Sequence, residues 1–412
     1  MSPLSFRKSV FFSFLYLLVS SFIFSGSFSF QVVSSSRASS LSHQLHAQLT
    51  GVSALNDTSL VDVKGTDLGL IFAHQGHHFF VFGDTFGFGS GFASNWRSNT
   101  MAYSVDSDPS DGILLRGWIT DPLSHNASEL ISSLKVDYLE MTCIPTTAFS
   151  YDDKMFIYYM SVKHWYETGG LWDCNNASIA VSIDNGKTFT KMANISWPGD
   201  GNFVQFGWAQ PGSLLSSNEY LYLLATPAGR FKACYLCRVP FTAILNQFSY
   251  EYFSGLDPSG APQWSSSFTA AHSIFPAPVG ELSVMWNAYL QKWTVFYTDN
   301  VMLSINIRLA DHLWGPWSKP YKIVDASEYP SLYGSFVHPD FVENNGERVY
   351  FIMSIFSVYN SFVMSVNLSS LKNITPTSST GFSSLSILLF TGSGFSVAVL
   401  FFSRKSQRHR QP

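Results

Sequence analysis

A repeated hairpin is the feature that most restricts how this chain can fold. Each copy has a short strand, a polar turn and a second strand rich in aromatic and β-branched residues. Five copies occur in the sequence: Thr66–Thr85, Met141–Val162, Val204–Thr226, Leu282–Thr298 and Phe336–Ile355. The intervals between copies have room for a four-stranded sheet with its loops, the unit from which a propeller is built. The sequence therefore predicts an all-β, five-bladed β-propeller over residues 50–370, with a single large β-sandwich as the alternative.

The composition indicates which kinds of molecule the protein can bind. Only 13% of residues are charged and the net charge is −4, so the chain is not basic enough to follow a phosphate backbone, and nucleic acid is excluded as a partner. Aromatic residues make up 16% of the chain. Aromatic side chains suit a pleated, half-buried surface, and their faces also stack on sugar rings, so a carbohydrate is the expected partner.

The segment Ser182–Phe189 has the pattern S-x-D-x-G-x-T-F and resembles the Asp box of sialidase-type propellers. In this pattern Asp184 caps a turn and Gly186 takes a positive φ. Phe189 then packs into the blade. The motif therefore predicts fold and not catalysis.

Two apolar segments flank the predicted propeller. The first follows Arg7 and Lys8 and precedes small residues, which is the layout of a signal peptide, with an uncleaved signal anchor as the alternative. The second is just long enough to cross a bilayer core, and a basic cluster follows it. The sequence therefore predicts a single-pass type I protein of the secretory pathway, at the cell surface or a lumenal membrane. Its predicted segments are a signal peptide (1–30), a Ser/Thr-rich stalk (371–384), a transmembrane helix (385–402) and a basic cytoplasmic tail (403–412).

Glycosylation sequons and cysteines agree with a secretory route. Six sequons are present, at Asn56, Asn126, Asn176, Asn194, Asn367 and Asn373. In an oxidising compartment the four cysteines, Cys143, Cys174, Cys234 and Cys237, predict two disulfides.

No cofactor or metal site is predicted. A zinc site would need a second close cysteine pair beside Cys234 and Cys237, or histidines at ligand spacing, and the sequence contains neither. His74, His77 and His78 crowd one turn, which we interpret as a solvated hairpin.

Polar residues recur at one level of the repeat, on the strand before each turn. At or just before the first strand of each successive copy, the residue at this level is Asp67, Glu140, Gln205, Glu281 or His338. An acid within an apolar strand is costly unless it is paired or wetted, so recurring acids indicate a shared, solvated pocket. Asp84, at the end of a neighbouring strand, joins them. Four acids are therefore catalytic candidates for glycoside cleavage: Asp67, Glu281, Glu140 and Asp84. The alternative is that the aspartates cap turns and Glu140 pairs with a buried arginine.

Arg97, Arg230 and Arg308 each lie in apolar or aromatic surroundings, where an unpaired charge is costly. They either clamp a substrate carboxylate, as in sialidases, or pair with the acids.

Longer motifs carry a resemblance to a known family over roughly residues 60–368. They are Gly65–Gly69, Phe82–Phe86, Trp96–Asn99, Asp108–Gly112, Thr226–Arg230, Val279–Asn287 and Leu332–Pro339. These stretches resemble a widespread secreted domain catalogued as of unknown function, related to five-bladed glycosidase propellers, whose bacterial members are known as endo-D-arabinanases. The resemblance implies hydrolysis of a polysaccharide, with the four acids named above as the matching carboxylates. Candidate substrate-binding residues within or beside these motifs are Arg97, Trp96, Asn99, Arg230, Trp286, Asn287 and His338. A non-catalytic glycan-binding propeller and a sialidase-like enzyme are the alternatives.

Overall fold

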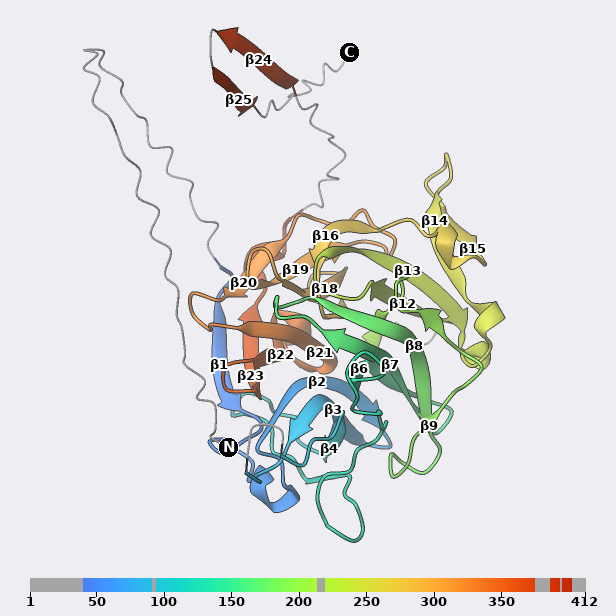
Figure 1. Cartoon of the computed structure of the whole chain (residues 1–412), viewed down its shortest axis with the longest axis vertical. Coiled ribbons are helices and arrows are strands. Elements are labelled where there is room, and N and C mark those ends of the chain that lie inside the picture. The colour runs from blue at the N-terminus through green and yellow to red at the C-terminus, as the bar shows by residue number, and fades with distance from the viewer. Residues whose placement is uncertain (1–39, 91–93, 213–218, 375–385, 393–394, 402–412) are drawn as a thin grey trace, which may run out of the picture. The chain divides into compact units, whose positions relative to one another are not determined.

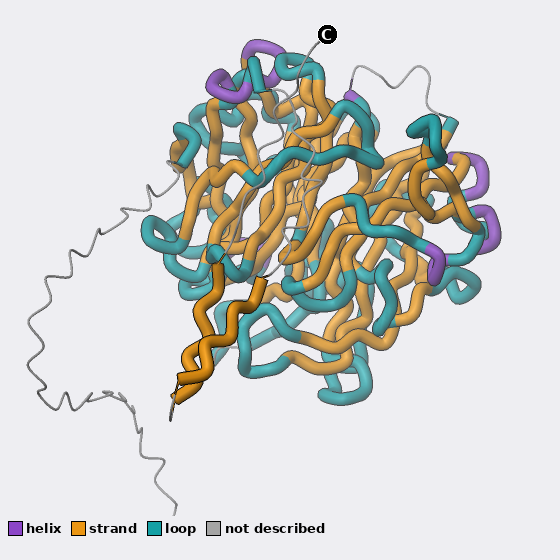
Figure 2. Tube along the Cα trace, turned by 90° about the horizontal axis from the view of Figure 1, so that it is seen from above, coloured by secondary structure: helices purple, strands orange, loops and turns teal. Residues whose placement is uncertain are grey.

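The computed structural model describes residues 40–90, 94–212, 219–374, 386–392 and 395–401. In these ranges the regular structure consists of strands and single turns of 3-10 helix in the connecting loops (Figure 2). The strands form five blades (Figure 1). The prediction of an all-β, five-bladed propeller is confirmed.

Each blade begins with one of the hairpins read in the sequence. The first blade contains β2 (Gly65–His74), β3 (His77–Phe86), β4 (Thr100–Ser104) and β5 (Gly117–Trp118). The second contains β6 (Thr142–Tyr151), β7 (Lys154–Trp165), β8 (Trp172–Ser182), β9 (Thr190–Lys191) and β10 (Trp197–Pro198). The third contains β11 (Gln205–Gln210), β12 (Tyr220–Thr226), β13 (Lys232–Pro240), β14 (Glu251–Leu256), β15 (Pro262–Ser265) and β16 (Phe275–Val279).

The last two blades complete the ring. The fourth contains β17 (Leu282–Asn287), β18 (Lys292–Asp299), β19 (Ser304–Ala310) and β20 (Tyr321–Asp325). The fifth contains β21 (Leu332–Glu343), β22 (Arg348–Ile355), β23 (Asn360–Asn367) and β1 (His43–Gln48). The 3-10 turns are Thr58–Val61, Phe241–Ala243, Gln247–Ser249, Phe268–Ala270, Asn344–Gly346 and Ser369–Leu371.

Two pairings link elements that the hairpin repeat alone does not join. The inner strands β11 and β17 pair in parallel at Ala209↔Val284 and Gln210↔Met285, so the third and fourth blades share one hydrogen-bonded sheet. Strand β1 pairs antiparallel with β23. The last blade therefore combines both ends of the described propeller, and β1 lies before the predicted domain start at residue 50.

The hydrophobic core lies between neighbouring blades. One cluster joins the first, second and fifth blades, and three others join the second and third, the third and fourth, and the fourth and fifth. Phe80, Phe82 and Tyr158 are among its fully buried side chains. Burying one such large side chain stabilises the fold by roughly 1.5–3 kcal/mol, which explains why the repeat is so rich in aromatic residues.

The Asp box holds its turn as predicted. Asp184 Oδ1 accepts from the Thr188 N–H at 3.0 Å, and Oδ2 accepts from the Thr188 hydroxyl at 2.7 Å. Gly186 has a φ of +83°, and the half-buried Phe189 packs against the core. The motif is structural, as its local chemistry indicates.

His74 corrects the interpretation of its turn as a solvated hairpin. Its side chain is buried, with Nδ1 2.7 Å from Ser150 Oγ and Nε2 3.0 Å from Asn185 Oδ1. These contacts connect the first blade to the Asp box of the second. His74 is therefore packed against a neighbouring blade, whereas the turn residues Gln75 and Gly76 are exposed.

The prediction of two disulfides is wrong, because all four cysteines are free. Cys234 and Cys237 lie three residues apart on β13, in different hydrophobic clusters. Side chains at i and i+3 of a strand face opposite sides, with Cα atoms about 10 Å apart, too far for a disulfide. Cys143 instead lies beside Glu140 and Lys191, at 3.4 Å from each.

The transmembrane helix predicted for 385–402 is also corrected. Its described residues form a two-stranded antiparallel hairpin, β24 (Ser386–Gly392) and β25 (Phe395–Phe401). The segment is rich in β-branched and aromatic residues and contains glycine, all of which lower helix propensity. Across the ranges that the structure describes, no helix combines the length and apolarity needed to cross a bilayer.

Several predicted features fall partly or wholly outside the described residues. These are the signal peptide, the stalk beyond residue 374 and the cytoplasmic tail. Among the sequons, Asn194 and Asn373 are exposed, whereas Asn126, Asn176 and Asn367 are half-buried. The Asn56 side chain donates to Leu49 O and Ile113 O. Glycosylation stays a prediction at all six positions, and at Asn56 it would compete with these two bonds.

Candidate active site

A pocket of about 800 Å³ collects the predicted acids at one end of the inner strands. Asp67, Asp84 and Glu281 all line it, as do Gln205 and Arg230. Its volume is in the range of small-molecule sites. Most of the remaining wall is apolar or aromatic, including Phe86, Trp96, Trp165, Trp172, Tyr333, Phe336, Phe356 and Tyr359. The pocket thus combines a few acids with surfaces on which sugar rings can stack.

An irregular backbone in β2 places Asp67. The β2–β3 ladder shifts register on both sides of Leu68, which has a φ of +63°. A bulky residue in this region is a steric outlier, and such outliers cluster at functional sites. Opposite, Gly83 leaves room for the carboxylate: a Cβ at Gly83 would lie 2.3 Å from Asp67 Oδ1. The glycine of the Phe82–Phe86 motif is therefore explained by this close approach.

Asp67 is incompletely hydrogen-bonded. Its Oδ2 accepts from the Tyr333 hydroxyl at 2.8 Å. Its Oδ1 is buried without a hydrogen bond from the described residues, although the Tyr359 hydroxyl also interacts with the Asp67 carboxyl group. Burial, followed by the negative charge of Asp84, raises the pKa of Asp67 to about 7, although the bond from Tyr333 acts in the opposite direction. Near neutral pH this carboxyl group can therefore give or take a proton.

Asp84 is the second acid, and it is better supplied with donors. Its Oδ1 accepts from Trp96 Nε1 at 2.8 Å and from the Thr142 hydroxyl at 2.6 Å. Burial raises the pKa of Asp84 to about 7, and the two hydrogen bonds act against this rise because they favour the ionised form. Two carboxyl groups in one pocket that both titrate in this range can divide the roles of acid and base between them.

Glu281 is paired with an arginine. Arg230 donates from Nε to both Glu281 oxygens, at 2.8 and 3.0 Å, and from Nη2 to Oε1 at 2.6 Å. Burial is the largest single influence and lowers the pKa of Arg230, but the charge and hydrogen bonds of Glu281, together with the charges of Tyr333 and Asp67, outweigh it, so the pKa of Arg230 is raised. The guanidinium also lies over the ring of Tyr333, at 4.8 Å. Arg230 was expected either to clamp a substrate carboxylate or to pair with an acid, and in the structure it pairs with Glu281.

Glu140 does not join the other three acids. Met141 lines the pocket and Glu140 does not, because successive side chains in an extended chain point to opposite sides. Glu140 instead accepts from Ser161 Oγ at 2.9 Å and lies 3.5 Å from Lys191 Nζ. The expectation that all four acids share one pocket is therefore wrong for Glu140.

Three other candidates lie away from the pocket. Trp286 packs edge-on against Trp293, and the buried Asn287 donates to Gly346 O. Both come at the end of β17, about 17–20 Å along the strand from Glu281. His338 follows the pocket-lining Tyr333 by five residues and does not line the pocket. In the last blade the residue at the level of Asp67 is therefore Tyr333.

The side chains of the segment Trp96–Asn99 lie in two places, some in the pocket and some in the interior of the fold. Trp96 lines the pocket and Arg97 does not. Arg97 donates to the carbonyls of Ala127 and Asp62. Asn99 is buried, and its amide donates to two backbone carbonyls and accepts from two backbone N–H groups. Arg97 and Asn99 therefore support the local fold.

The arginine cluster of a sialidase is not assembled. Of Arg97, Arg230 and Arg308, only Arg230 lines the described pocket. Arg308 is buried and donates to Ser318 O and Tyr297 Oη. Only one of the three is therefore placed to meet a substrate carboxylate, and that one already pairs with Glu281.

Two residues that orient the aspartates were missed from the sequence. Tyr333 and Thr142 each donate to one of them. Tyr333 stands within the Leu332–Pro339 motif, which was a usable signal. Thr142 carries no such signal, because a threonine at the start of a strand is common.

The fold and the site define a β-propeller with an acidic pocket at one end of its inner strands. A match to a protein-family model identifies the family. Residues 53–365 match the model of DUF4185, a domain of unknown function, and the chain belongs to this family. Among curated proteins, none matches the chain.

One solved structure with a TM-score above 0.5 shares the fold at low sequence identity, and weaker matches accompany it. A protein of Bacteroides ovatus ATCC 8483, named as a candidate hydrolase, is 14% identical with a TM-score of 0.55, over 77% of this chain and 89% of that one. An exo-β-1,3-galactanase of Phanerochaete chrysosporium is 11% identical with a TM-score of 0.49, over 86% of this chain and 76% of that one. A GH43_1 enzyme of Xanthomonas citri is 11% identical with a TM-score of 0.43, over 75% and 88%. At 14% identity, the match to the Bacteroides ovatus protein shows that the two chains share a fold and no more than that.

Proposed function

We propose that this protein is a glycoside hydrolase that cleaves an extracellular or lumenal polysaccharide, with endo-D-arabinanase-like activity. The observation that carries the proposal is the Asp67–Asp84 pair, whose pKa values burial raises to about 7, in a pocket lined by aromatic rings. Two carboxyl groups that flank a glycosidic bond are the machinery of most such enzymes.

We assign the proton donor to Asp67 and the base or nucleophile to Asp84. Asp84 accepts two hydrogen bonds on one oxygen, which stabilise its ionised form. Asp67 has a buried oxygen without a hydrogen bond from the described residues. The negative charges of Asp84 and Glu281 add to the effect of burial and raise the pKa of Asp67. The proton passes from Asp67 to the glycosidic oxygen as the C–O bond breaks. Asp84 either takes a proton from the attacking water or attacks the anomeric carbon itself.

The rest of the pocket favours a neutral sugar. The charge of Arg230 is already paired with Glu281, so it is not free to bind a substrate carboxylate. Trp96, Trp165 and Trp172 line the wall, where their faces can stack on furanose or pyranose rings. Arabinan fits this chemistry better than a sialoside. The proposed location in the secretory pathway agrees with a polysaccharide substrate.

The test is a substrate panel with the full-length protein, purified from a eukaryotic secretory host. D-arabinan, L-arabinan, arabinogalactan and sialosides are incubated separately, and released oligosaccharides are resolved by chromatography. The proposal expects oligosaccharides from D-arabinan and none from an Asp67→Asn/Asp84→Asn double variant. Saturable glycan binding without any product would favour the non-catalytic receptor, and release of sialic acid would favour the sialidase class.

A further inference from the structure

Three potential metal ligands meet at the seam between the first and last blades. His78 lies near the start of β3, and His338 and Asp340 lie in β21. Asp84 is six residues further along β3, about 20 Å away. The group is therefore separate from the acidic pocket, at the opposite end of the same strands.

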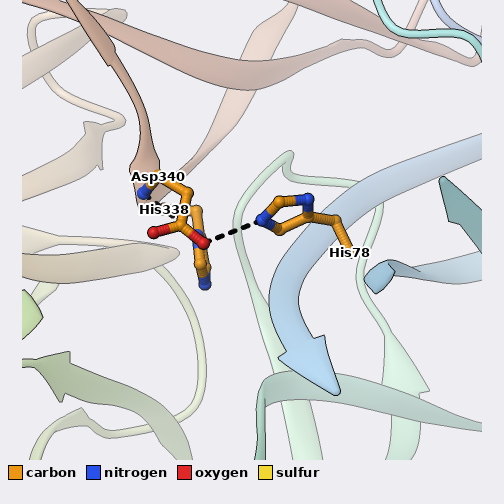
Figure 3. Close-up of side chains that lie close together, drawn as sticks. All are labelled: His78, His338 and Asp340. Carbon is orange, nitrogen blue, oxygen red and sulfur yellow. Dashed lines mark hydrogen bonds and ion pairs between the residues drawn. The ribbon is translucent and has the colours of Figure 1, made fainter. Parts of the chain in front are cut away.

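A bulge in β21 presents two of these ligands. Val337 pairs with Phe351 and Val342 pairs with Val349, so four residues of β21, 338–341, face a single residue of β22. A bulge of this kind removes residues from the ladder and re-aims their side chains. The side chains of His338 and Asp340 lie beside that of His78 across the seam (Figure 3).

The distances are close to those of a metal site. His78 Nε2 lies 2.9 Å from Asp340 Oδ2, and His338 Nδ1 lies 3.6 Å from the same oxygen. All three ligand atoms lie within 4.8 Å of one another. Tetrahedral ligands at about 2.0–2.2 Å from a zinc ion are themselves about 3.4 Å apart. Small side-chain rotations would therefore bring the three atoms to bonding distance.

The burial of the two histidines and the exposure of Asp340 also suit a metal site. The side chains of His78 and His338 are 15% and 8% exposed, whereas Asp340 is 58% exposed. Both imidazole rings pack against Phe341: the His78 ring is tilted at a centroid distance of 4.6 Å, and the His338 ring is edge-on at 6.1 Å. The exposed carboxylate gives an ion a path from solvent and leaves room for water as a fourth ligand. Elsewhere in the described ranges, no other group of three such side chains comes together.

We propose that His78, His338 and Asp340 bind one divalent transition-metal ion of the zinc class, which clamps the first blade to the last. Two imidazoles and one carboxylate are a donor set that suits Zn²⁺. The ion replaces the proton between His78 and Asp340 and the 3.2 Å bond from Asp340 N–H to His338 Nδ1. This site is independent of the proposed hydrolase activity.

The test uses untagged full-length protein stripped with a chelator. Zn²⁺ titration by calorimetry is expected to show one equivalent bound, and a 100-fold excess over Kd should raise Tm by about 5 °C. Co²⁺ is expected to give the visible absorption of a nitrogen- and oxygen-ligated ion. His338→Asn and Asp340→Asn should each weaken Zn²⁺ binding by at least about tenfold, the least expected of a ligand when outer-shell partners already cost 10–100-fold.

The matched control is His164→Asn. His164 and Asp137 form a similar pair, 2.7 Å apart, with the histidine also 15% exposed, and no third ligand of the described chain joins them. This variant should bind Zn²⁺ as the wild type does. The proposal is overturned if wild-type protein shows no saturable Zn²⁺ binding, or if His164→Asn weakens binding as much as Asp340→Asn does. Because Asp340 is exposed, its variant should fold even where His338→Asn does not.

Discussion

The pocket around Asp67 and Asp84 differs sharply from the cluster around Glu140, although the sequence places their acids at equivalent points of the repeat. Asp67 has one buried oxygen without a hydrogen bond from the described residues. Glu140 accepts from Ser161 Oγ and from the Leu134 N–H, and it lies beside Lys191. The pocket therefore keeps its carboxyl groups available for proton transfer, whereas the other cluster engages its carboxylate in structural contacts.

The contrast shows that the surroundings of an acid, and not its place in a repeat, decide its chemistry. Burial without sufficient donors raises the pKa of a carboxyl group towards neutrality. The partners of Glu140 differ from those of the pocket aspartates, since they hold its carboxylate outside the pocket and beside a lysine.

The largest effect is expected at the pocket aspartates. Asp67→Asn and Asp84→Asn should each lower kcat by roughly 10²–10⁴, because an amide keeps the shape of the acid but cannot transfer its proton. Steady-state kinetics on the substrate identified by the panel gives the measurement, with circular dichroism to verify folding. If both variants retain more than about a tenth of wild-type kcat, the assignment of these acids fails.

The next effect is a dependence of stability on pH. Both pocket aspartates have a folded-state pKa of about 7, raised from 3.8. The folded chain therefore binds their protons more tightly than the unfolded chain, so the stability they confer is present below pH 4 and is lost as pH rises towards 7. For one group the loss is about 4 kcal/mol.

Urea unfolding at several pH values between 4 and 8 measures this dependence. The double variant Asp67→Asn/Asp84→Asn removes both titrating groups, so its free energy of unfolding should fall less over this range than that of the wild type. Parallel curves for the two proteins would contradict the raised pKa values.

The smallest effect is expected at Glu140. Glu140→Gln should change kcat by less than about threefold, because the side chain lies outside the pocket and the amide retains part of its hydrogen bonding. The same kinetic assay gives the measurement, with Asp67→Asn run alongside. A loss at Glu140 as large as that at Asp67 would mean that the two regions act together in catalysis.

The sequence by itself determined the architecture. Five hairpins with alternating aromatic and β-branched residues are local signals, since each hairpin carries its own turn and its own apolar face. The Asp box was read correctly for the same reason: the bonds that Asp184 makes join residues within one turn. Asp67, Asp84, Glu281 and Arg230 were also identified from the sequence as site candidates, and they meet in one pocket.

Only the tertiary structure decided which candidates meet, because that depends on strand register. A bulge beside Leu68 accompanies the entry of Asp67 into the pocket, whereas His338 lies in a bulge five residues beyond the pocket-lining Tyr333. A shift of one residue moves a side chain to the other face of a strand, as the neighbours Glu140 and Met141 show. The pairing of β1 with β23 joins segments more than 300 residues apart in the sequence, and no local pattern encodes it. Contacts of this kind depend on how the blades close around one another, so they appear only in the folded chain.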